Sequence, residues 1–349
     1  MSKILVVGYF GYCTNQLDGQ TVKTRDVYRL VREQVKGEVD YYDTEDFQYH
    51  KIGIPKLFWK MIRCNILFYL PAQNNLKIIF PIIFCLSIVF RFKIHYFVVG
   101  GWLKEFLVKK PIHRFMLKRI EGIHVETKRL ENELKLYFHF LNVDNFPNFR
   151  FFEFNPKRFR VSSRKKNLVI CFLSRVEQSK GLDTLVEISE YLHHAGLSKM
   201  VKIDFYGQKK DDYFDTHLSE NPMFEYKGTI QPSEVMSTLR LYDVLIFPSH
   251  YEGEGCPGIL VEALSVGLPI IASNWKYNNE FIIDGVNGFL CDTFDAKSYL
   301  KAIKTMLFDE HLRKQMSKHA YRMSEYYSAK YAKRKLQEYV VNSNVDDKK

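Results

Sequence analysis

Short apolar runs alternate with amphipathic stretches along the whole chain, and this rhythm predicts parallel β-sheets covered by α-helices. The first half contains apolar runs at residues 3–8, 39–43, 66–70, 94–99 and 122–127. The second half contains them at 167–173, 201–207, 224–230, 243–248 and 270–273. An Arg- and Lys-rich stretch, residues 155–166, separates the two sets. We therefore expect an α/β protein with two doubly wound, Rossmann-like domains, one over residues 1–162 and one over 163–325.

The most apolar segment, residues 76–92, raises the question of a membrane span. Its uninterrupted run, 78–90, has 13 residues and contains Pro81. A bilayer-spanning helix needs about 20 residues. We predict a packed helix of the first domain, and a membrane-touching edge on it stays open.

The positive charge of the chain lies entirely in its first half. Residues 1–162 carry 26 Lys and Arg against 15 Asp and Glu, whereas residues 163–349 carry 25 of each sign. This asymmetry favours an anionic partner for the first half, such as a membrane surface or a lipid pyrophosphate. A solvated basic surface without a partner is the alternative. Nucleic acid is disfavoured, because the aromatic residues lie in buried-strand patterns and not among the basic ones.

The six cysteines are scattered and form no C-x-x-C pair, so we expect free thiols in a reducing compartment. No metal-ligand spacing and no D-x-D motif occurs, and Asp211-Asp212 is interpreted as loop charge. The chain goes directly into a strand, which predicts no signal peptide.

Residues 251–264, YEGEGCPGILVEAL, contain the most informative chemistry. They follow the strand at 243–248, and helical spacing begins near Pro257 or Gly258. Glycines permit close approach of a ligand to the backbone, and the start of a helix suits a diphosphate. Glu254 lies before this helix and Glu262 about two turns into it. Ionised carboxylates accept hydrogen bonds from hydroxyl groups, so the stretch suits a nucleotide-sugar.

Two cations flank the turn after the strand at 167–173. Arg175 and Lys180 lie at the carboxyl end of that strand, where ligands of α/β sheets bind. Arg can hold a phosphate with two parallel hydrogen bonds and Lys supplies a point charge. We expect the pair to clamp one diphosphate.

Glu254 and Glu262, separated by seven residues, resemble the E-x7-E motif of retaining glycosyltransferases with the GT-B fold, the family numbered four (glycosyl transferases group 1), nearest to the bacterial capsule and exopolysaccharide type. The resemblance implies a final helix, within residues 326–349, that crosses back to the first domain. It implies a catalytic role for Glu254 on the donor sugar. The implied diphosphate site comprises Arg175, Lys180, Gly19, Gly255, Cys256, Pro257, Gly258 and Ile259. The implied ribose and base site comprises Glu262, Gly207, Thr229 and Ile230.

The first domain supplies candidates for the acceptor side. They lie where the first helix opens and after the strand at 94–99: Gln20, Thr21, Lys23, Gly100, Gly101 and Trp102. Many family members have a His after this strand that touches the donor sugar, and here Gly100-Gly101-Trp102 takes its place. His95 lies inside the strand and is expected to be buried; His113 and His124 are weaker candidates.

The resemblance implies a retaining, metal-independent hexosyltransferase without a cofactor. A UDP-sugar is favoured as donor, and a lipid-linked saccharide as acceptor in bacterial surface polysaccharide synthesis. The expected location is cytoplasmic and peripheral, at the inner face of the cell membrane. Two alternatives stay open: a GT-B nucleotide-sugar epimerase, and a non-catalytic basic protein that binds membrane or nucleic acid.

Overall fold

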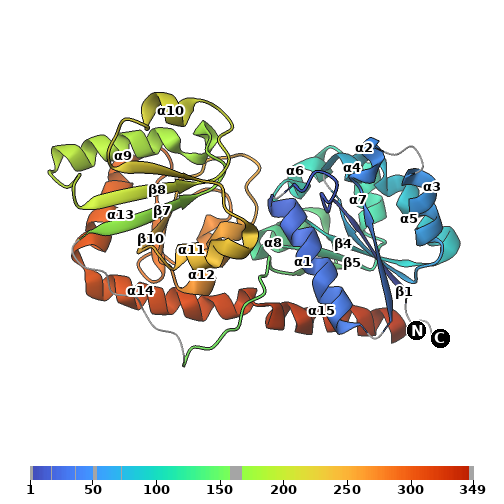
Figure 1. The fold of residues 1–349 in the computed structure, drawn as a ribbon. Helices are drawn as coiled ribbons and strands as arrows, with labels where there is room; N and C mark the ends of the chain where they lie inside the picture. The colour runs from blue at the N-terminus through green and yellow to red at the C-terminus, as the bar shows by residue number, and fades with distance from the viewer. Residues whose placement is uncertain are drawn as a thin grey trace. The chain divides into compact units, whose positions relative to one another are not determined.

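The computed structural model describes residues 3–16, 18–35, 37–49, 53–71, 73–157 and 167–345. The chain forms two compact units, Met1–Phe151 with Ala329–Lys349, and Phe152–Ser328. Each unit holds one six-stranded sheet (Figure 1). The first unit thus ends at Phe151 and not near residue 162, and the predicted boundary itself lies outside the described residues. The segment that joins the first unit again begins at Ala329, three residues later than predicted.

The sheet of the first unit is parallel throughout and has the strand order β2-β1-β3-β4-β5-β6. Its strands are β1 (Lys3–Gly8), β2 (Glu38–Asp43), β3 (Ile66–Leu70), β4 (Lys93–Phe97), β5 (Gly122–Val125) and β6 (Val143–Asn145). The apolar runs predicted all but β6, which is only three residues long and carries two polar residues. Its helices are α1 (Gly19–Gln34), α2 (Asp46–Tyr49), α3 (Gly53–Met61), α4 (Gln73–Ile78), α5 (Phe80–Phe90), α6 (Leu103–Val108), α7 (Pro111–Leu117), α8 (Lys128–Phe138) and α15 (Ala329–Val345).

Alternate residues of β3 face opposite sides of the sheet, as the two-residue period of a strand requires. Ile66, Phe68 and Leu70 join the core that α1 and α15 cover. Tyr69 faces the other side, where it stacks on Phe80 of α5 at 6.0 Å between ring centroids. Both faces are therefore covered, as in other parallel sheets.

The apolar segment 76–92 forms two helices and not one. α4 ends at Ile78, and α5 begins at Phe80 with Pro81 in its first turn. Only Phe80, Ile83 and Phe84 of α5 are buried, so the outer side of this helix is exposed. No helix among the described residues is long and apolar enough to cross a membrane.

A network of hydrogen-bonded polar side chains joins α15 to the sheet. The Nδ1 of His95 lies 2.9 Å from the Nε2 of His124, and the Nδ1 of His124 lies 2.5 Å from Asp144. Asp144 also accepts a hydrogen bond from the hydroxyl of Tyr339, whose ring stacks on His124 at 4.0 Å. His95 is 3% exposed, which agrees with its predicted structural role. These contacts hold α15 in the first unit in addition to its apolar residues.

Burial and hydrogen bonds shift the pKa values of the titratable groups in this network. It lowers the pKa of His95 well below the ordinary value, and the neighbouring His124 lowers it further. Burial also lowers the pKa of His124, against the opposing effect of Asp144. Burial by itself would raise the pKa of Asp144, but hydrogen bonds from His124 and Tyr339 hold it below its usual value.

The sheet of the second unit is also parallel, with the order β12-β11-β10-β7-β8-β9. Its strands are β7 (Leu168–Leu173), β8 (Val201–Tyr206), β9 (Phe224–Gly228), β10 (Val244–Phe247), β11 (Ile270–Ser273) and β12 (Gly288–Cys291). Its α-helices are α9 (Leu182–His194), α10 (Tyr213–His217), α11 (Val235–Leu239), α12 (Gly258–Val266), α13 (Ala296–Phe308) and α14 (Glu310–Met323). α9 packs with α13, and α12 packs with α11 and α14, so helices cover both faces (Figure 1).

We expect the stability of the first unit to fall as the pH falls below about 6.5, the ordinary pKa of histidine. The pKa of His95 and of His124 is lower in the folded chain, so the unfolded chain binds protons more readily, and the stability present above that pH is lost on acidification. Each histidine contributes a slope of up to about 1.4 kcal/mol per pH unit. Urea denaturation between pH 7.5 and pH 5 measures it.

In this experiment His95→Gln should reduce the slope of the unfolding free energy against pH. His217→Gln, at an exposed histidine, should leave this slope unchanged. Equal slopes for the wild type and both variants would contradict the assignment.

Candidate active site

The predicted donor-site residues meet where the strand order of the second sheet reverses. β8 and β9 lie on one side of β7, and β10, β11 and β12 lie on the other, which makes β7 and β10 neighbours. In open α/β sheets, ligands bind at the carboxyl ends of the strands at this point of reversal. The loop with Arg175 and Lys180 leaves β7 there, and the loop with Glu254 leaves β10.

Two glycines let these loops approach neighbouring backbone closely. Gly181 has φ of +84°, and a Cβ there would lie 2.3 Å from the carbonyl oxygen of Pro248, at the end of β10. Gly207, after β8, has φ of +134°, and a Cβ there would lie 1.7 Å from the carbonyl oxygen of Ser174. Only glycine fits such positions. The loops are also joined by a hydrogen bond of 3.1 Å from the His250 N–H to the Ser179 carbonyl.

Lys180 and Glu254 form a buried ion pair across the two loops. Lys180 is 6% exposed and Glu254 is 8% exposed. The hydroxyl of Ser249 donates a second hydrogen bond of 2.8 Å to the same oxygen of Glu254. The structure thus brings together the lysine of the predicted diphosphate clamp and the first glutamate of the predicted motif.

The ring of Tyr251 joins both predicted cations. The guanidinium of Arg175 lies 4.9 Å from its centroid, and the ammonium of Lys180 lies 4.4 Å from it. Cations at such distances are attracted by the negative face of an aromatic ring. Arg175 is more open, with 42% of its side chain exposed, and pairs with Glu177 at 3.2 Å. Arg175 and Lys180 therefore lie around one ring, with Arg175 toward solvent.

The helix after the second loop, α12, begins at Gly258, and its N-cap residue, Pro257, makes no side-chain hydrogen bond to the first turn. Uncapped backbone N–H groups at a helix start suit an anion. The side chains of Cys256 and Ile259 are buried, so these two residues offer a ligand their backbone only. Glu262 is the fifth residue of α12, which places it one turn into the helix and not two. Its side chain is half-buried.

The predicted base-side residues lie at the carboxyl ends of β8 and β9, on the same edge of the sheet. The Gly207 N–H donates to the Gly228 carbonyl at 2.9 Å, and the Tyr226 hydroxyl donates to the Gly207 carbonyl at 2.9 Å. Thr229 is exposed and Ile230 is half-buried directly after β9. This arrangement brings Gly207 next to the strand end that precedes Thr229.

In the first unit, α1 begins at Gly19 with a capping box. The side chain of Asp18 accepts the N–H groups of Gln20 and Thr21, and the Thr21 hydroxyl accepts the Asp18 N–H. Thr21 is fully buried in this cap, so its side chain is structural. Gly19 is exposed, and a Cβ there would meet nothing within 4 Å.

Lys23 is not available to an acceptor, which corrects the prediction. Its side chain is 1% exposed, and its ammonium lies 2.7 Å from Glu126 and 3.3 Å from the Val98 carbonyl. The other oxygen of Glu126 accepts the Gly100 N–H at 3.1 Å. Glu126 thereby connects α1 to the Gly100–Trp102 loop after β4. Lys23 acts on this loop only through Glu126.

Sequence reasoning did not single out Ser249, Tyr251 and Glu126 as functional residues. Each follows the carboxyl end of a strand: Ser249 and Tyr251 follow β10, and Glu126 follows β5. That position was the available signal, since polar residues directly after a buried parallel strand face the ligand edge. The motif spacing indicated Glu254 but gave no indication of Ser249, which hydrogen-bonds to it.

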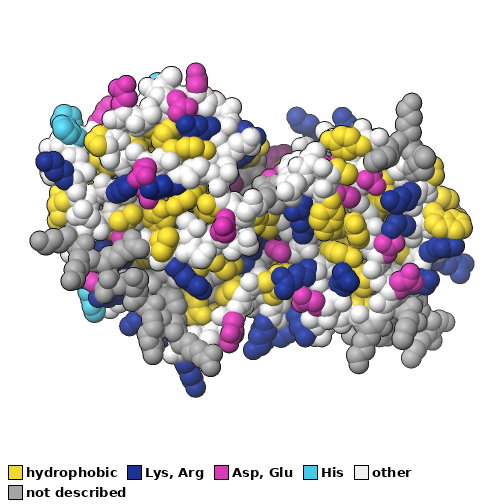
Figure 2. Space-filling model, in the orientation of Figure 1, with side chains coloured by type: hydrophobic (Ala, Val, Ile, Leu, Met, Phe, Trp, Pro, Cys, Tyr) yellow, Lys and Arg dark blue, Asp and Glu magenta, His cyan; other side chains and the backbone are white. Residues whose placement is uncertain are grey.

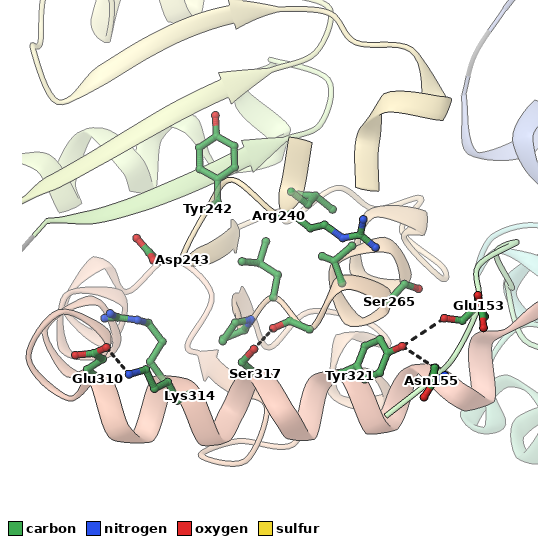
Figure 3. A pocket seen from close by; sticks show the side chains of 16 residues that line it. Glu153, Asn155, Arg240, Tyr242, Asp243, Ser265, Glu310, Lys314, Ser317 and Tyr321 are labelled. Carbon is green, nitrogen blue, oxygen red and sulfur yellow. Dashed lines mark hydrogen bonds and ion pairs between the residues drawn. The ribbon is translucent and has the colours of Figure 1, made fainter. Parts of the chain in front are cut away.

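A cavity of about 400 Å³ lies elsewhere in the second unit (Figure 3). It is lined by the residues before β10 and β11, by α14 and by the segment around Glu153 and Asn155. These are the amino ends of the strands, the edge opposite to the loops described above. At the edge of this cavity the Tyr321 hydroxyl accepts a hydrogen bond of 2.8 Å from the Asn155 N–H. None of the predicted site residues lines this cavity.

Within the described part of the chain, no group of three or more His, Cys, Asp or Glu side chains could hold a metal ion. Four of the six cysteines are buried free thiols, and Cys13 and Cys85 are exposed.

Residues 153–323 match the model of the family described as glycosyl transferases group 1. This match contains the site of the second unit in full. This segment of the chain is therefore similar to the group 1 glycosyltransferases, the family that the E-x7-E motif resembles.

Two relatives and one solved structure illustrate the similarity. A capsular polysaccharide biosynthesis glycosyltransferase, CapM of Staphylococcus aureus, is 26% identical over 154 residues, which is 42% of this chain and 38% of that protein. An uncharacterized 41.2 kDa protein from the cps region of Klebsiella pneumoniae is 30% identical over 138 residues, 40% of this chain and 36% of that protein. The aligned parts thus span little more than a third of these relatives.

The solved structure is that of Anabaena Alr3699/HepE in complex with UDP-glucose. It has a TM-score of 0.73 and 14% identity, and the alignment covers 98% of this chain and all of that chain. The two parallel six-stranded sheets and this similarity define the GT-B fold.

The buried pair Lys180–Glu254 should show strong coupling in a double-mutant cycle. Lys180→Met and Glu254→Gln each leave a buried partner unpaired, and breaking a buried pair costs about 3–5 kcal/mol. The double variant should lose less than the sum, by about 1–3 kcal/mol. Urea denaturation of the four proteins measures this coupling.

The matched control is the exposed pair Glu310–Lys314 of α14, whose coupling should stay near 0.3–0.5 kcal/mol, roughly that of helix surface pairs. If the losses of unfolding free energy in the Lys180 and Glu254 variants add up in the double variant, the ion pair contributes nothing to stability.

Gly19→Ala should fold normally, since open space surrounds this position at the start of α1. A gain of up to about 1 kcal/mol is expected from reduced chain entropy. If donor phosphates approach this backbone, affinity for UDP should fall about tenfold, a loss of about 1.4 kcal/mol. Calorimetric titration with UDP measures it.

Gly181→Ala is the steric control: it should destabilise the second unit, because φ is +84° and Pro248 is in the way. Unchanged UDP affinity in Gly19→Ala would remove Gly19 from the proposed site.

Proposed function

We propose that this protein is a retaining, metal-independent glycosyltransferase that takes a hexose-type sugar from a nucleoside-diphosphate sugar, with UDP as the favoured nucleotide. The observation that carries the proposal is the meeting of Lys180, Glu254 and Arg175 at the point of reversal of the second sheet. The match of residues 153–323 to the model of the group 1 family supports the reaction class. The structural relative was solved with UDP-glucose, which supports a UDP-sugar here.

The charges of the site suit the diphosphate. Arg175, Lys180 and backbone N–H groups at the start of α12 would bind its oxygens. The same groups stabilise the negative charge that develops on the leaving diphosphate, which is the task of a metal ion in other transferases. Because these residues supply the positive charge, the reaction needs no divalent ion.

The carboxylates suit the hydroxyl groups on either side of the diphosphate. Glu262, one turn into α12, would accept hydrogen bonds from the ribose. Glu254 would accept them from the donor sugar, with Lys180 and Ser249 holding its carboxylate in place. A carboxylate fixed by two partners is oriented before the substrate arrives, which reduces the cost of binding.

Retention follows from attack on the same face as the departing group. The acceptor oxygen bonds to the anomeric carbon as the bond to the diphosphate breaks. The released diphosphate oxygen takes the proton of the acceptor hydroxyl. In this scheme the protein orients the two substrates and stabilises charge, and a separate protein base is not required.

The proposed acceptor is a lipid-linked saccharide in bacterial surface polysaccharide synthesis. The names of the relatives, one from capsular polysaccharide biosynthesis and one from a cps region, support this setting. The excess of positive charge in residues 1–162 supports an anionic lipid partner. We place the reaction at the inner face of the cell membrane. An epimerase would consume the nucleotide-sugar without an acceptor, so product analysis with and without acceptor separates the two activities.

UDP-glucose should raise the thermal stability of the protein, and GDP- and ADP-glucose should raise it less. A donor at 100 times its Kd stabilises the folded state by about 2.7 kcal/mol. Glu262→Ala should weaken UDP and UDP-glucose alike. In its folded fraction, Glu254→Gln should leave UDP binding nearly intact and reduce turnover. Differential scanning fluorimetry and release of UDP measure these effects.

Turnover should also survive EDTA. No stabilisation by any of the three nucleotide-sugars, or full turnover in both glutamate variants, would contradict the proposed function.

A further inference from the structure

The outer face of the first unit combines exposed apolar side chains with positive charge. α5 contains no charged residue at all, and Ser87 is its one polar side chain, apart from the thiol of Cys85. A helix that is apolar on all sides is normally buried. Here Ile82, Ile88 and Val89 are 60%, 64% and 70% exposed. Something other than the described residues of this chain is expected to cover them.

Neighbouring helices extend this face. Phe58 of α3 touches Phe90 at the end of α5, with ring centroids 5.9 Å apart, and Trp59 of α3 is 54% exposed. α7 packs against α5 and exposes Ile112 and Phe115. We call this surface the α3–α5–α7 face; it consists of Ile54, Phe58, Trp59, Ile82, Ile88, Val89, Phe90, Ile112 and Phe115. Its apolar residues come from three helices and are therefore not the incidental exposure of one side chain.

The charge of the same segment is mostly positive, although three of its lysines, Lys56, Lys60 and Lys104, pair with acidic residues outside it. Between residues 53 and 119 the sequence has 12 Lys and Arg and a single acidic residue, Glu105. Two of the arginines lie directly on exposed aromatic rings, Arg63 on Trp59 at 3.9 Å and Arg119 on Phe115 at 3.5 Å. Figure 2 shows dark blue Lys and Arg side chains next to the yellow apolar ones on this unit.

We propose that the α3–α5–α7 face docks on an anionic lipid bilayer, with its apolar side chains at the depth of the headgroups and its Lys and Arg side chains on the lipid phosphates. An apolar face with flanking cations and exposed aromatic rings has the composition of interfacial membrane-binding surfaces. A second copy of this chain would bring positive charge against positive charge, which opposes self-association through this face.

This inference deepens the proposed function, since it assigns the contact with the membrane that carries a lipid-linked acceptor. It does not depend on the glycosyl transfer itself. Vesicle binding tests the face, whereas UDP binding tests the donor site, so either can fail alone.

Flotation with vesicles that contain phosphatidylglycerol, compared with vesicles of phosphatidylcholine alone, is the first experiment. We expect binding to the anionic vesicles that weakens steeply with salt, because salt screens exposed charges. Lys109→Gln/Lys110→Gln/Arg119→Gln should reduce the partition coefficient about 100-fold, at about 1 kcal/mol for each cation. Ile82→Gln/Ile88→Gln should reduce it at least about tenfold, since apolar burial is lost.

Matched controls come from the second unit. Lys199→Gln/Lys301→Gln/Lys318→Gln makes the same charge change at exposed positions, and Ile283→Gln changes an exposed isoleucine. These variants should bind vesicles like the wild type. All variants should keep the wild-type thermal stability and UDP binding, which separates loss of docking from loss of folding.

The exposed thiol on α5 offers a direct measurement. In a Cys13→Ser variant, Cys85 is the exposed cysteine and carries a polarity-sensitive fluorophore. Its emission should shift to the blue with anionic vesicles, whereas a label on Cys13 in a Cys85→Ser variant should not respond. Equal binding of all variants, binding that ignores lipid charge, or concentration-dependent dimerisation abolished by Ile82→Gln/Ile88→Gln would overturn the proposal.

Discussion

The buried ion pair between Lys180 and Glu254 is the contact on which the site of the second unit depends. Taking two charges out of water costs several kcal/mol for each ion, and only a close, hydrogen-bonded geometry offsets that cost. Ser249 supplies the additional hydrogen bond to Glu254, and Tyr251 presents its ring to Lys180. The pair is therefore held in one geometry, and two loops that are 74 residues apart in sequence are held with it.

In the first unit, too, carboxylates at the ends of strands bind groups of neighbouring elements. Glu126 binds Lys23 with one oxygen and the Gly100 N–H with the other. Asp43, at the end of β2, accepts the N–H groups of Phe10 and Tyr12 at 3.0 and 3.1 Å. In each case a carboxylate at the end of a strand, or directly after it, fixes the backbone of a neighbouring loop. The loops at the ligand edges are ordered by charge and hydrogen bonds, while the sheets below them are ordered by apolar packing.

The two ends of the second sheet have different physical character. At the carboxyl ends of its strands lie close-packed loops, glycines without room for a side chain, and the start of α12. At the amino ends lies the cavity of about 400 Å³, bordered by Ser317, whose hydroxyl donates to the Gly267 carbonyl at 2.6 Å (Figure 3). Helix starts and uncapped N–H groups favour anions at the first edge. The electrostatics of that edge, and not the size of a hollow, therefore support the proposed donor site there.

The elements were predictable because their signals are local. A buried parallel strand is a continuous apolar run, and β1, β3, β7 and β10 each satisfy this in sequence. Strand β6 was missed because two of its three residues are polar, and the four-residue strand β12 was also not predicted. The motif residues Glu254 and Lys180 could be singled out by spacing. Their mutual contact could not, since it depends on β7 and β10 becoming neighbours after a crossover.

Lys23 and α5 show where local signals mislead. A lysine in an amphipathic helix is expected in solvent, but Glu126, 103 residues away, provides a buried partner. An apolar helix is expected in a core, but the sheet needs only one side of α5. The sequence by itself determined most of the strands and helices, the family motif and the charge asymmetry. Tertiary structure decided which charges are paired and which apolar side chains stay outside, because burial depends on residues distant in the chain.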